Sequence, residues 1–175
     1  MAGTWLVPVT ALRRTPGAQR HELRSGALGR LAVADTVVAA DSPAVADVTL
    51  TAVDGGVEVA GKVAAEWASA CRRCLRPVSG RMTSAVRELY RPLVPGGDED
   101  DEETYPLGVD HLDLEPLVRD SILLGLPLAP LCAEDCAGLC ARCGAELASG
   151  PCGCDTQVAD PRWAALDALR LHDRD

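Results

Sequence analysis

Hydrophobic and polar residues alternate with the period of a β-strand over a long central stretch of the chain. The alternation leads into Asp54-Gly55-Gly56, a sequence typical of a tight hairpin turn. It resumes after that turn, is interrupted at Cys71-Arg-Arg-Cys74, and then returns toward Tyr90. The pattern predicts an antiparallel meander over residues 44–91, with the first cysteine pair at one of its turns. The apolar positions that define it are Val45, Val48, Leu50, Val57, Val59, Val63, Trp67, Val78, Met82, Val86 and Tyr90.

The flanks of this meander are less distinct. Residues 5–9 favour a short strand, which is followed by a connection containing Arg13, Arg14, Pro16 and Gly17. The Ala-rich piece from Val63 to Ala70 also fits a helix, and its pattern alone does not decide between helix and strand.

The second half of the chain changes character. Residues 95–105 form an acidic, Gly-led run without apolar period, which indicates a linker. Asp113 is a good N-cap for a helix whose apolar face begins at Leu114. Gly125-Leu126-Pro127 is expected to end that helix. Asp160-Pro161 starts a second, terminal helix with proline at its first position, followed by Trp163, Leu166 and Leu169.

These elements predict an α+β protein. We expect an antiparallel β meander or partly open barrel, followed by a helix, a zinc-bound cysteine-rich segment and a short C-terminal helix. The boundaries place a mainly β core with the first Cys-x-x-Cys turn at 1–94 and the acidic linker at 95–111. The remainder, 112–175, is expected to pack with the core as one domain.

Composition limits the class of protein. A chain of 175 residues can bury a substantial core, which here must be aliphatic because the chain has no Phe. The N-terminus lacks a secretory pattern, and the longest uncharged apolar stretch, 121–133, is too short to span a bilayer. We therefore expect a cytoplasmic protein without membrane contact.

Charge is distributed unevenly. Residues 1–91 carry twelve Lys and Arg against eight Asp and Glu, whereas residues 92–175 carry five against eighteen, for a net charge of −9. Overall acidity disfavours indiscriminate nucleic-acid binding, although the basic half does not exclude it. The acidic half suits a basic protein partner. The alternative is that both halves are solvated surface.

Eight cysteines carry the candidate chemistry. In a reducing compartment they indicate metal or redox use rather than disulfides. A two-residue spacer lets one turn aim two sulfurs at one metal, and zinc accepts four thiolates in a tetrahedron. The cysteines form four closely spaced couples, namely Cys71 and Cys74, Cys132 and Cys136, Cys140 and Cys143, and Cys152 and Cys154.

Locality predicts how the couples combine. The unit Cys140-Ala-Arg-Cys143-Gly144 has the form of a zinc knuckle, and its nearest partner is Cys152-Gly-Cys154. A site closed within fifteen residues costs the least loop entropy. The other four cysteines then form a second site across the linker, giving about two structural zinc ions. The sequence alone leaves three pairings of the couples open.

Other chemistries are weaker interpretations. A thiol-based redox or zinc-responsive regulator is the main alternative, but neither Cys-x-x-Cys lies in a strand-to-helix turn of thioredoxin type. An iron–sulfur cluster also uses four cysteines. No histidine falls within a cysteine cluster, and no nucleophile–base arrangement is visible, so we expect no enzymatic activity.

Several motifs together resemble the YceD family of large ribosomal RNA subunit accumulation proteins. The matching pieces span roughly residues 70–170 and keep the family's order and spacing. They are Cys71-Arg-Arg-Cys74-Leu-Arg-Pro, Asp113-Leu-Glu-Pro-Leu-Val-Arg-Asp120, Leu126-Pro-Leu-Ala-Pro130-Leu-Cys132, Cys136-Ala-Gly-Leu-Cys140-Ala-Arg-Cys143 and Asp160-Pro-Arg-Trp-Ala-Ala-Leu.

The resemblance implies a role in the synthesis, processing or accumulation of 23S rRNA and in assembly of the large ribosomal subunit. It implies no catalytic residue. The implied partner is a 23S rRNA precursor or an assembly intermediate, with a small basic protein of the large subunit as a further candidate. Some family members lack the later cysteines, so the second site is interpreted as an elaboration of this branch.

A docking surface is expected around the first cysteine turn. Metal would hold the turn rigidly, and the planar fork of arginine suits phosphate. The candidate residues for RNA or partner binding are Arg72, Arg73, Arg76 and Arg81, joined by Arg13, Arg14, Arg20 and Arg24 if the N-terminal segment packs nearby. The alternative is that these arginines pair with local Asp and Glu.

Overall fold

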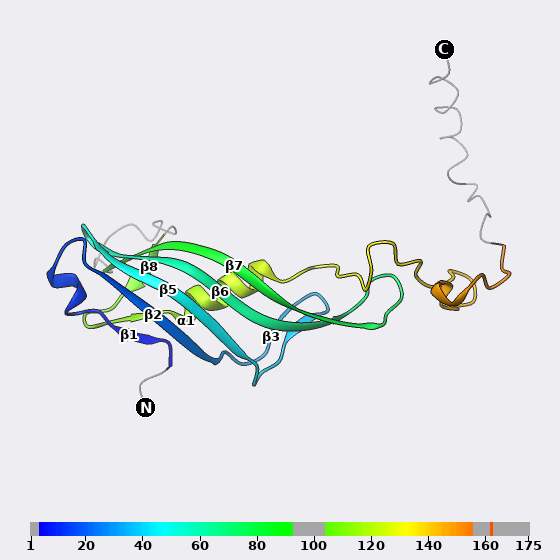
Figure 1. Ribbon diagram of the computed structural model, residues 1–175, viewed down its shortest axis with the longest axis horizontal. Helices are drawn as coiled ribbons and strands as arrows, with labels where there is room; N and C mark the ends of the chain where they lie inside the picture. The colour runs from blue at the N-terminus through cyan, green and yellow to red at the C-terminus, as the bar shows by residue number, and fades with distance from the viewer. Residues whose placement is uncertain (1–3, 93–103, 156–161, 163–175) are drawn as a thin grey trace, which may run out of the picture.

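The computed structural model describes residues 4–92, 104–155 and 162. Within these ranges the chain forms nine strands, one α-helix and two short 3-10 turns (Figure 1). The elements are β1 (Leu6–Pro8), η1 (Leu12–Arg14), β2 (Gln19–Ala27), β3 (Leu31–Val33), β4 (Thr36–Val38), β5 (Pro43–Val53), β6 (Gly56–Ala70), β7 (Pro77–Pro92), β8 (Thr104–Leu107), β9 (His111–Asp113), α1 (Glu115–Gly125) and η2 (Leu147–Ser149).

All nine strands belong to one sheet, with β6 at its centre. β6 pairs with β7 from Val57 to Ala70, and on its other edge it pairs first with β5 and then, at Ala68, with β4. β7 continues into a parallel pair with β8, and β9 and β1 follow on that side. The predicted meander is therefore confirmed as β5, β6 and β7.

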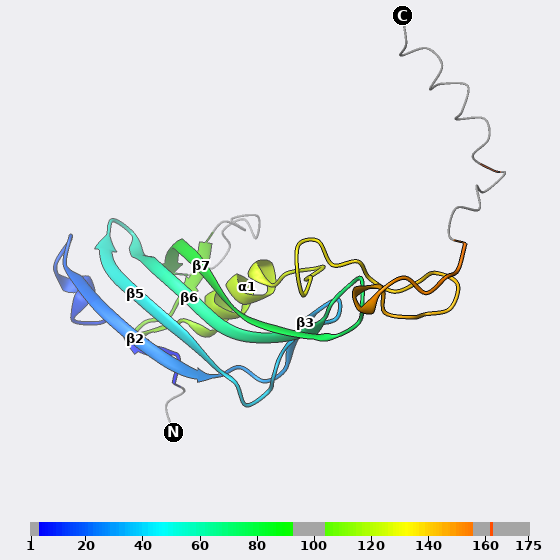
Figure 2. The same ribbon diagram turned by 45° about the vertical axis from the view of Figure 1, so that its right-hand side comes forward.

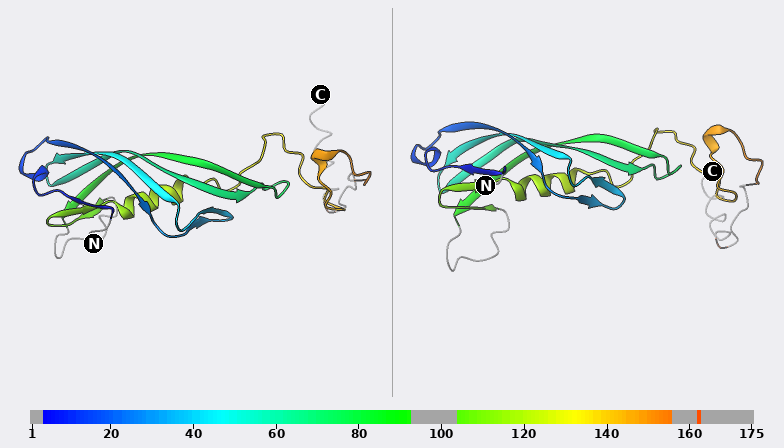
Figure 3. Two further views of the ribbon diagram at one scale, coloured as in Figure 1. Left: turned by 60° about the horizontal axis from the view of Figure 1, so that its bottom comes forward. Right: turned by 90° about the horizontal axis from the view of Figure 1, so that it is seen from below.

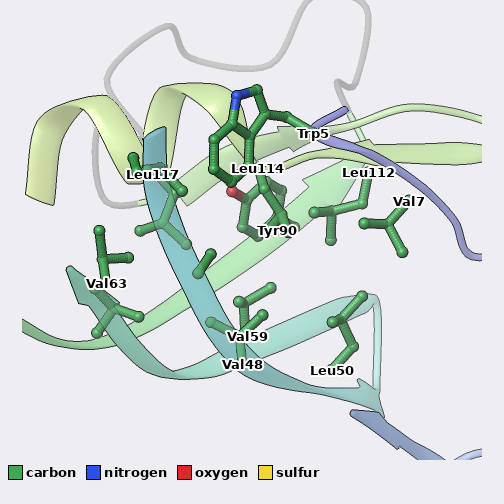
Figure 4. Packing of buried hydrophobic residues seen from close by; sticks show 14 of the residues in the cluster. Trp5, Val7, Val48, Leu50, Val59, Val63, Tyr90, Leu112, Leu114 and Leu117 are labelled. Carbon is green, nitrogen blue, oxygen red and sulfur yellow. The ribbon is translucent and has the colours of Figure 1, made fainter. Parts of the chain in front are cut away.

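The sheet curls over α1 into an open half-barrel. Figure 3 shows the strands arching above the helix, and Figure 2 shows the same arrangement from a second direction. Inward-facing residues of β5 and β6 meet the helix and β9 in the space between (Figure 4). Because burial of one such aliphatic side chain stabilises by roughly 1.5–3 kcal/mol, this aliphatic core suffices without Phe. Its largest fully buried side chains include Tyr90, Leu50, Leu112, Leu114, Leu117, Ile122 and Val48.

The start and end of α1 follow local signals. The Asp113 carboxylate accepts a hydrogen bond from the Glu115 N–H at 2.9 Å, although the N-cap position is Leu114. At the other end Leu126 is extended, as expected for a residue before proline. Gly125 is the last helical residue, and a side chain there would collide with Met82. The helix therefore ends where the sequence predicts.

Residues 63–70 belong to strand β6, as the predicted meander requires, and not to the alternative helix; Trp67 packs over Gly80 of β7. Two differences from the sequence prediction stand out. The N-terminal third contributes β2, β3 and β4, none of which the pattern identified. Residues 104–107, placed in the predicted linker, form β8. The acidic run at 95–103 and the predicted terminal helix at 160–175, apart from Arg162, lie outside the described residues. The division into domains stays a prediction.

The β6–β7 hairpin extends past the end of α1 and carries the first cysteine pair at its tip. Its last register pair is Ala70 with Pro77, and residues 71–76 form the turn. The chain leaving α1 is fastened alongside by Thr36 of β4, whose hydroxyl donates to the Pro127 carbonyl at 2.6 Å. It then reaches the hairpin tip and continues beyond it (Figure 1). Among the described residues, no helix has the length and apolar character needed to span a bilayer.

Candidate metal centres

The turn Cys71–Arg76, which we call the first knuckle, is built by two backbone hydrogen bonds. The Cys71 N–H donates to the Arg76 carbonyl at 2.8 Å, and the Leu75 N–H donates to the Cys71 carbonyl at 2.9 Å. Leu75 adopts a left-handed conformation with φ of 62°. The thiols of Cys71 and Cys74 are buried on the inside of this turn.

Cys132 and Cys136 complete the first tetrad with this turn. Cys71 Sγ lies 3.8 Å from Cys136 Sγ, and Cys74 Sγ lies 3.6 Å from Cys132 Sγ. All four sulfurs lie within 4.8 Å of one another. Four sulfurs at 2.3 Å around a tetrahedral ion stand about 3.8 Å apart, so the group has the size of a metal site.

The turn Cys140–Ala145, the second knuckle, repeats the backbone of the first. The Cys140 N–H donates to the Ala145 carbonyl at 2.8 Å, and the Gly144 N–H donates to the Cys140 carbonyl at 2.9 Å. Gly144 has φ of 72° and so occupies the position of Leu75. The two Cys-x-x-Cys units are therefore structural equivalents.

Cys152 and Cys154 complete the second tetrad. Gly153 between them has φ of 75°, a left-handed conformation that turns both sulfurs to the same side. The sulfurs of all four cysteines again lie within 4.8 Å of one another. A bridge between Leu139 and Glu146 closes the knuckle, and η2 links it to the last pair. The whole tetrad lies within residues 140–154.

In both tetrads the first cysteine has a lowered pKa and a later cysteine has a raised pKa. Burial raises the pKa of Cys71, but backbone N–H donors, with that of Cys74 foremost, outweigh it and lower the pKa to about 6. The backbone N–H groups of Cys143 and Arg142 lower the pKa of Cys140 to about 6. In each tetrad a later cysteine shows the opposite shift, because it donates to a neighbouring sulfur. The pKa is raised to about 12 for Cys132, by Cys136 first, and to about 12 for Cys154, by Cys143 first.

The structure brings together the two groups of cysteines that locality predicts. One group joins the first knuckle to Cys132 and Cys136, and the other is confined to the second knuckle and its neighbours. Each group offers four sulfur ligands at metal-binding spacing, so both tetrads can hold a metal ion.

Comparison with known proteins agrees with the motifs. The family model of the large ribosomal RNA subunit accumulation protein YceD matches residues 59–170, more than half of the chain and a span that contains all eight cysteines. The chain belongs to the YceD family. No solved structure matches it.

Mycobacterial proteins match this YceD chain along nearly its whole length. An uncharacterized protein of Mycobacterium tuberculosis is 38% identical over 170 residues, covering 95% of this chain and 81% of the relative. An uncharacterized protein of Mycobacterium leprae is 34% identical over 168 residues, which cover 94% of this chain and 77% of the relative. A third relative is the chloroplastic large ribosomal RNA subunit accumulation protein YCED homolog 1 of Arabidopsis thaliana. It is 30% identical over 73 residues, which cover 42% of this chain and 23% of the relative.

Three of the four candidate docking arginines of this YceD chain have local partners. Arg73 donates to the Cys136 carbonyl at 2.9 Å, Arg76 Nε lies 2.6 Å from Glu146 Oε1, and Arg81 pairs with Glu66 on the sheet at 3.2 Å. Among the described residues the side chain of Arg72 has no such partner, and it is exposed. Their role in binding RNA or a partner stays a prediction.

The N-terminal arginines lie elsewhere. η1, which contains Arg13 and Arg14, is at the opposite end of the sheet from the first knuckle (Figure 1). Arg20 and Arg24 both pair with Glu22 of their own strand. The expectation that these residues gather near the cysteine turn is wrong, because β2 joins the sheet beside β5 and not beside the tip of the hairpin.

Sequence reasoning allowed for pairing of these arginines with acidic residues but missed Glu146 as the partner of Arg76 and the Cys136 carbonyl as that of Arg73. Glu146 follows the second knuckle directly, and Arg76 is the last residue of the first. Aligning the two Cys-x-x-Cys units places Arg76 opposite Ala145 and Pro77 opposite Glu146, so a charged residue lies at the end of the first turn and directly after the second. That alignment was the only available signal, because the contact joins residues far apart in the chain.

Proposed function

We propose that this chain is a non-enzymatic zinc-binding factor of the cytoplasm that supports 23S rRNA accumulation and large ribosomal subunit assembly. The observation that carries the proposal is the family match, which covers both tetrads and bears the name of a ribosomal RNA accumulation protein. The protein acts by binding to a 23S rRNA precursor or to an assembly intermediate.

The donor set favours zinc. All-cysteine tetrads of this size are typical of structural Zn²⁺, which imposes no geometric preference of its own and is not redox-active. Four protein ligands also fill the tetrahedral shell, whereas catalytic zinc keeps one position open for water or substrate. This supports a structural and not a catalytic role for both ions.

The net charge of the metal-filled tetrads indicates which kind of partner surface the knuckles would bind. With four thiolates around one divalent ion, each filled tetrad has a net charge of about −2. Arg73 and Arg76 offset part of this charge locally, and Glu146 adds to it. The tip therefore fits a basic protein surface of an assembly intermediate better than a bare phosphate backbone. A small basic protein of the large subunit is a candidate for that surface.

Depletion and complementation test the proposal. In a strain depleted of this protein we expect the ratio of mature 23S to 16S rRNA to fall and precursors of the large subunit to accumulate on sucrose gradients. The wild-type chain should restore the ratio, and the Cys71→Ser/Cys74→Ser variant should not. Normal 23S levels and normal gradients after depletion would contradict the proposal. Crosslinking of the wild-type chain in the same cells identifies the RNA segment or protein in contact.

One observation favours a second candidate, a thiol-based redox or zinc-responsive regulator. Each tetrad has one exposed cysteine, Cys132 in the first and Cys143 in the second, which an oxidant can reach. A regulator would lose zinc and form disulfides during purification in air, and a reductant would restore zinc binding. Retention of two zinc ions per chain under the same treatment would instead support the structural role.

A further inference from the structure

Arg76 lies between the two tetrads. Its backbone carbonyl accepts the Cys71 N–H at 2.8 Å, which closes the first knuckle, and its guanidinium group extends toward the second knuckle. The Nε atom of the same group is 2.6 Å from Glu146 Oε1, directly after the second knuckle. Glu146 Oε1 is buried and has no aligned hydrogen-bond donor, so the ion pair with Arg76 offsets the cost of burying this charged oxygen. Arg76 thus joins the turn that carries Cys71 and Cys74 to the residue that follows the second knuckle.

Backbone contacts attach the second knuckle to the same turn. The Leu139 N–H donates to the Arg73 carbonyl at 3.1 Å. Gly138, with φ of 78°, approaches Arg73 so closely that a Cβ would stand 3.0 Å from that carbonyl oxygen. The Leu147 N–H donates back to the Gly138 carbonyl at 3.0 Å. The first knuckle therefore provides the surface on which the second is mounted.

We propose that the two metal centres are thermodynamically coupled, with Arg76 as the coupling residue, so that filling the first tetrad raises the metal affinity of the second. This inference rests on the proposed zinc occupancy. It assigns to Arg76 and Glu146 a positioning role toward the metal, in addition to any contact with a partner.

The coupling follows from preorganisation. A metal in the first tetrad fixes residues 71–76 in one conformation and brings residues 132–136 against them. The Arg73 carbonyl and the Arg76 guanidinium are then already placed for Leu139 and Glu146, so the second knuckle loses less conformational freedom when its own metal binds. Without the first metal, the cost of ordering residues 71–76 and 132–136 is added to the binding of metal by the second tetrad.

The charge of the first tetrad acts in the same direction. The net negative charge of four thiolates and one Zn²⁺ would attract the Arg76 guanidinium, which also faces the buried oxygen of Glu146. If the guanidinium group is removed, that carboxylate is left without its counter-charge. By linkage the effect is reciprocal, and metal in the second tetrad strengthens the first by the same factor.

The experiment uses the full-length chain with zinc and a competing chelator, so that the affinity of each tetrad is measured separately. Cys71→Ser/Cys74→Ser leaves only the second tetrad, and Cys140→Ser/Cys143→Ser leaves only the first. Coupling energies between sites typically correspond to factors of about 5–150, so we expect the second tetrad to bind zinc at least about fivefold more weakly when the first is removed.

The role of Arg76 is tested by Arg76→Ala and, because that variant can disturb the turn itself, by Glu146→Gln. Each is expected to weaken the second tetrad at least about fivefold in the wild-type background and to have little effect in the Cys71→Ser/Cys74→Ser background. Arg76→Lys, which keeps the charge but not the planar fork, should restore part of the affinity. Arg81→Ala removes a comparable exposed ion pair on the sheet, with Glu66, and is the matched control.

Two results would overturn the inference. One is an affinity of the second tetrad that changes less than about twofold when the first is removed. The other is an effect of Arg76→Ala and Glu146→Gln that is equally large in both backgrounds, which would make the ion pair a purely local support. A wild-type chain that binds no zinc would instead overturn the proposed function, so the two failures are distinguishable. Substitution of cobalt gives an independent readout, since thiolate-to-cobalt absorption reports the filling of the one tetrad that each double variant keeps.

Discussion

The two knuckles have the same backbone but different surroundings. The first connects the ends of two long strands, and its cysteines meet partners far along the chain: Cys132 lies 58 residues after Cys74, and Cys136 lies 65 residues after Cys71. The second closes within residues 140–154, and of its four cysteines only Cys140 is buried. The same turn is thus used once between distant segments and once within a local loop.

This difference indicates two roles for one motif. A local tetrad needs only its own short loop, because closing a short loop costs little entropy. A tetrad that spans some 60 residues depends on the sheet, which holds the first knuckle at the end of β6 and β7, and on α1, which delivers the chain to it. A metal in the first tetrad would therefore cross-link the fold, whereas one in the second would stabilise a module mounted on that cross-link.

Removal of the first tetrad has the largest expected effect on this arrangement. Cys71→Ser/Cys74→Ser should lose one of two zinc ions and detach residues 127–155 from the hairpin, because a structural zinc contributes about 10 kcal/mol of folding free energy in small modules. Hydrogen exchange should show loss of protection at Arg72 and Leu139, whose N–H groups bond across the junction. Zinc is counted by elemental analysis.

The matched control removes the same number of cysteines from the other knuckle. Cys140→Ser/Cys143→Ser should also lose one zinc, but the Arg72 N–H should stay protected by its bond to the Pro130 carbonyl. If both double variants release the segment equally, or if Cys140→Ser/Cys143→Ser loses both metals outright, the distinction between cross-link and local module is wrong.

Local signals explain what the sequence revealed of both regions. Asp54-Gly55 forms a two-residue turn between Val53 and Gly56, as the dipeptide predicts. The four cysteine couples have spacings that zinc turns require, and the shortest closure combined them correctly. Proline after Leu126 marked the end of α1. The signal for the hairpin turn, for each couple and for the helix end lies within a few residues, and the first tetrad is what remains once the local one is closed.

What the sequence left hidden has no signal in the hydrophobic pattern. The half-buried positions of β2 are occupied by Arg20, Glu22 and Arg24, and Glu22 pairs with both arginines, while Leu23 is exposed. The hydrophobic pattern of this strand is therefore inverted, and no period of two could reveal it. The Arg76–Glu146 pair is equally invisible, since it exists only once both knuckles are in place.

Exchanging the left-handed residues should change stability in opposite directions. A left-handed conformation costs a residue with a side chain roughly 1–2 kcal/mol. Gly144→Leu should therefore destabilise the second tetrad by about that amount, and the cause is conformational because no atom lies within 4 Å of the added Cβ. Leu75→Gly relieves the same cost in the first knuckle, where the leucine side chain is 65% exposed.

The gain from Leu75→Gly is smaller than the loss from Gly144→Leu, because glycine also gives the unfolded chain more freedom, worth about 0.4–1 kcal/mol. We expect a gain of at most about 1 kcal/mol. Zinc affinity by chelator competition measures both variants against the wild-type chain. A loss of zinc affinity in Leu75→Gly would show that this leucine makes a packing contribution that its exposure does not suggest.

The smallest expected effect is a difference in zinc affinity between substitutions of the middle arginine in each knuckle. Arg73 and Arg142 occupy the same position, two residues after the first cysteine of each turn. Arg73 donates to the Cys136 carbonyl at 2.9 Å and so ties the turn to the second half of its own tetrad. For Arg142, no side-chain hydrogen bond or ion pair is present among the residues that the structure describes.

Arg73→Ala should therefore weaken zinc binding by the first tetrad by about 1 kcal/mol, which is about fivefold, because a charged hydrogen bond at a partly exposed site is worth less than a buried one. Arg142→Ala should change the second tetrad by less than about 0.5 kcal/mol, as expected for a surface substitution. The measurement is again competition with a chelator, in chains that keep only the tetrad concerned. Equal effects of the two substitutions would mean that both arginines act through general charge compensation of the thiolates, and that the Cys136 carbonyl contact does not distinguish the cross-linking knuckle from the local one.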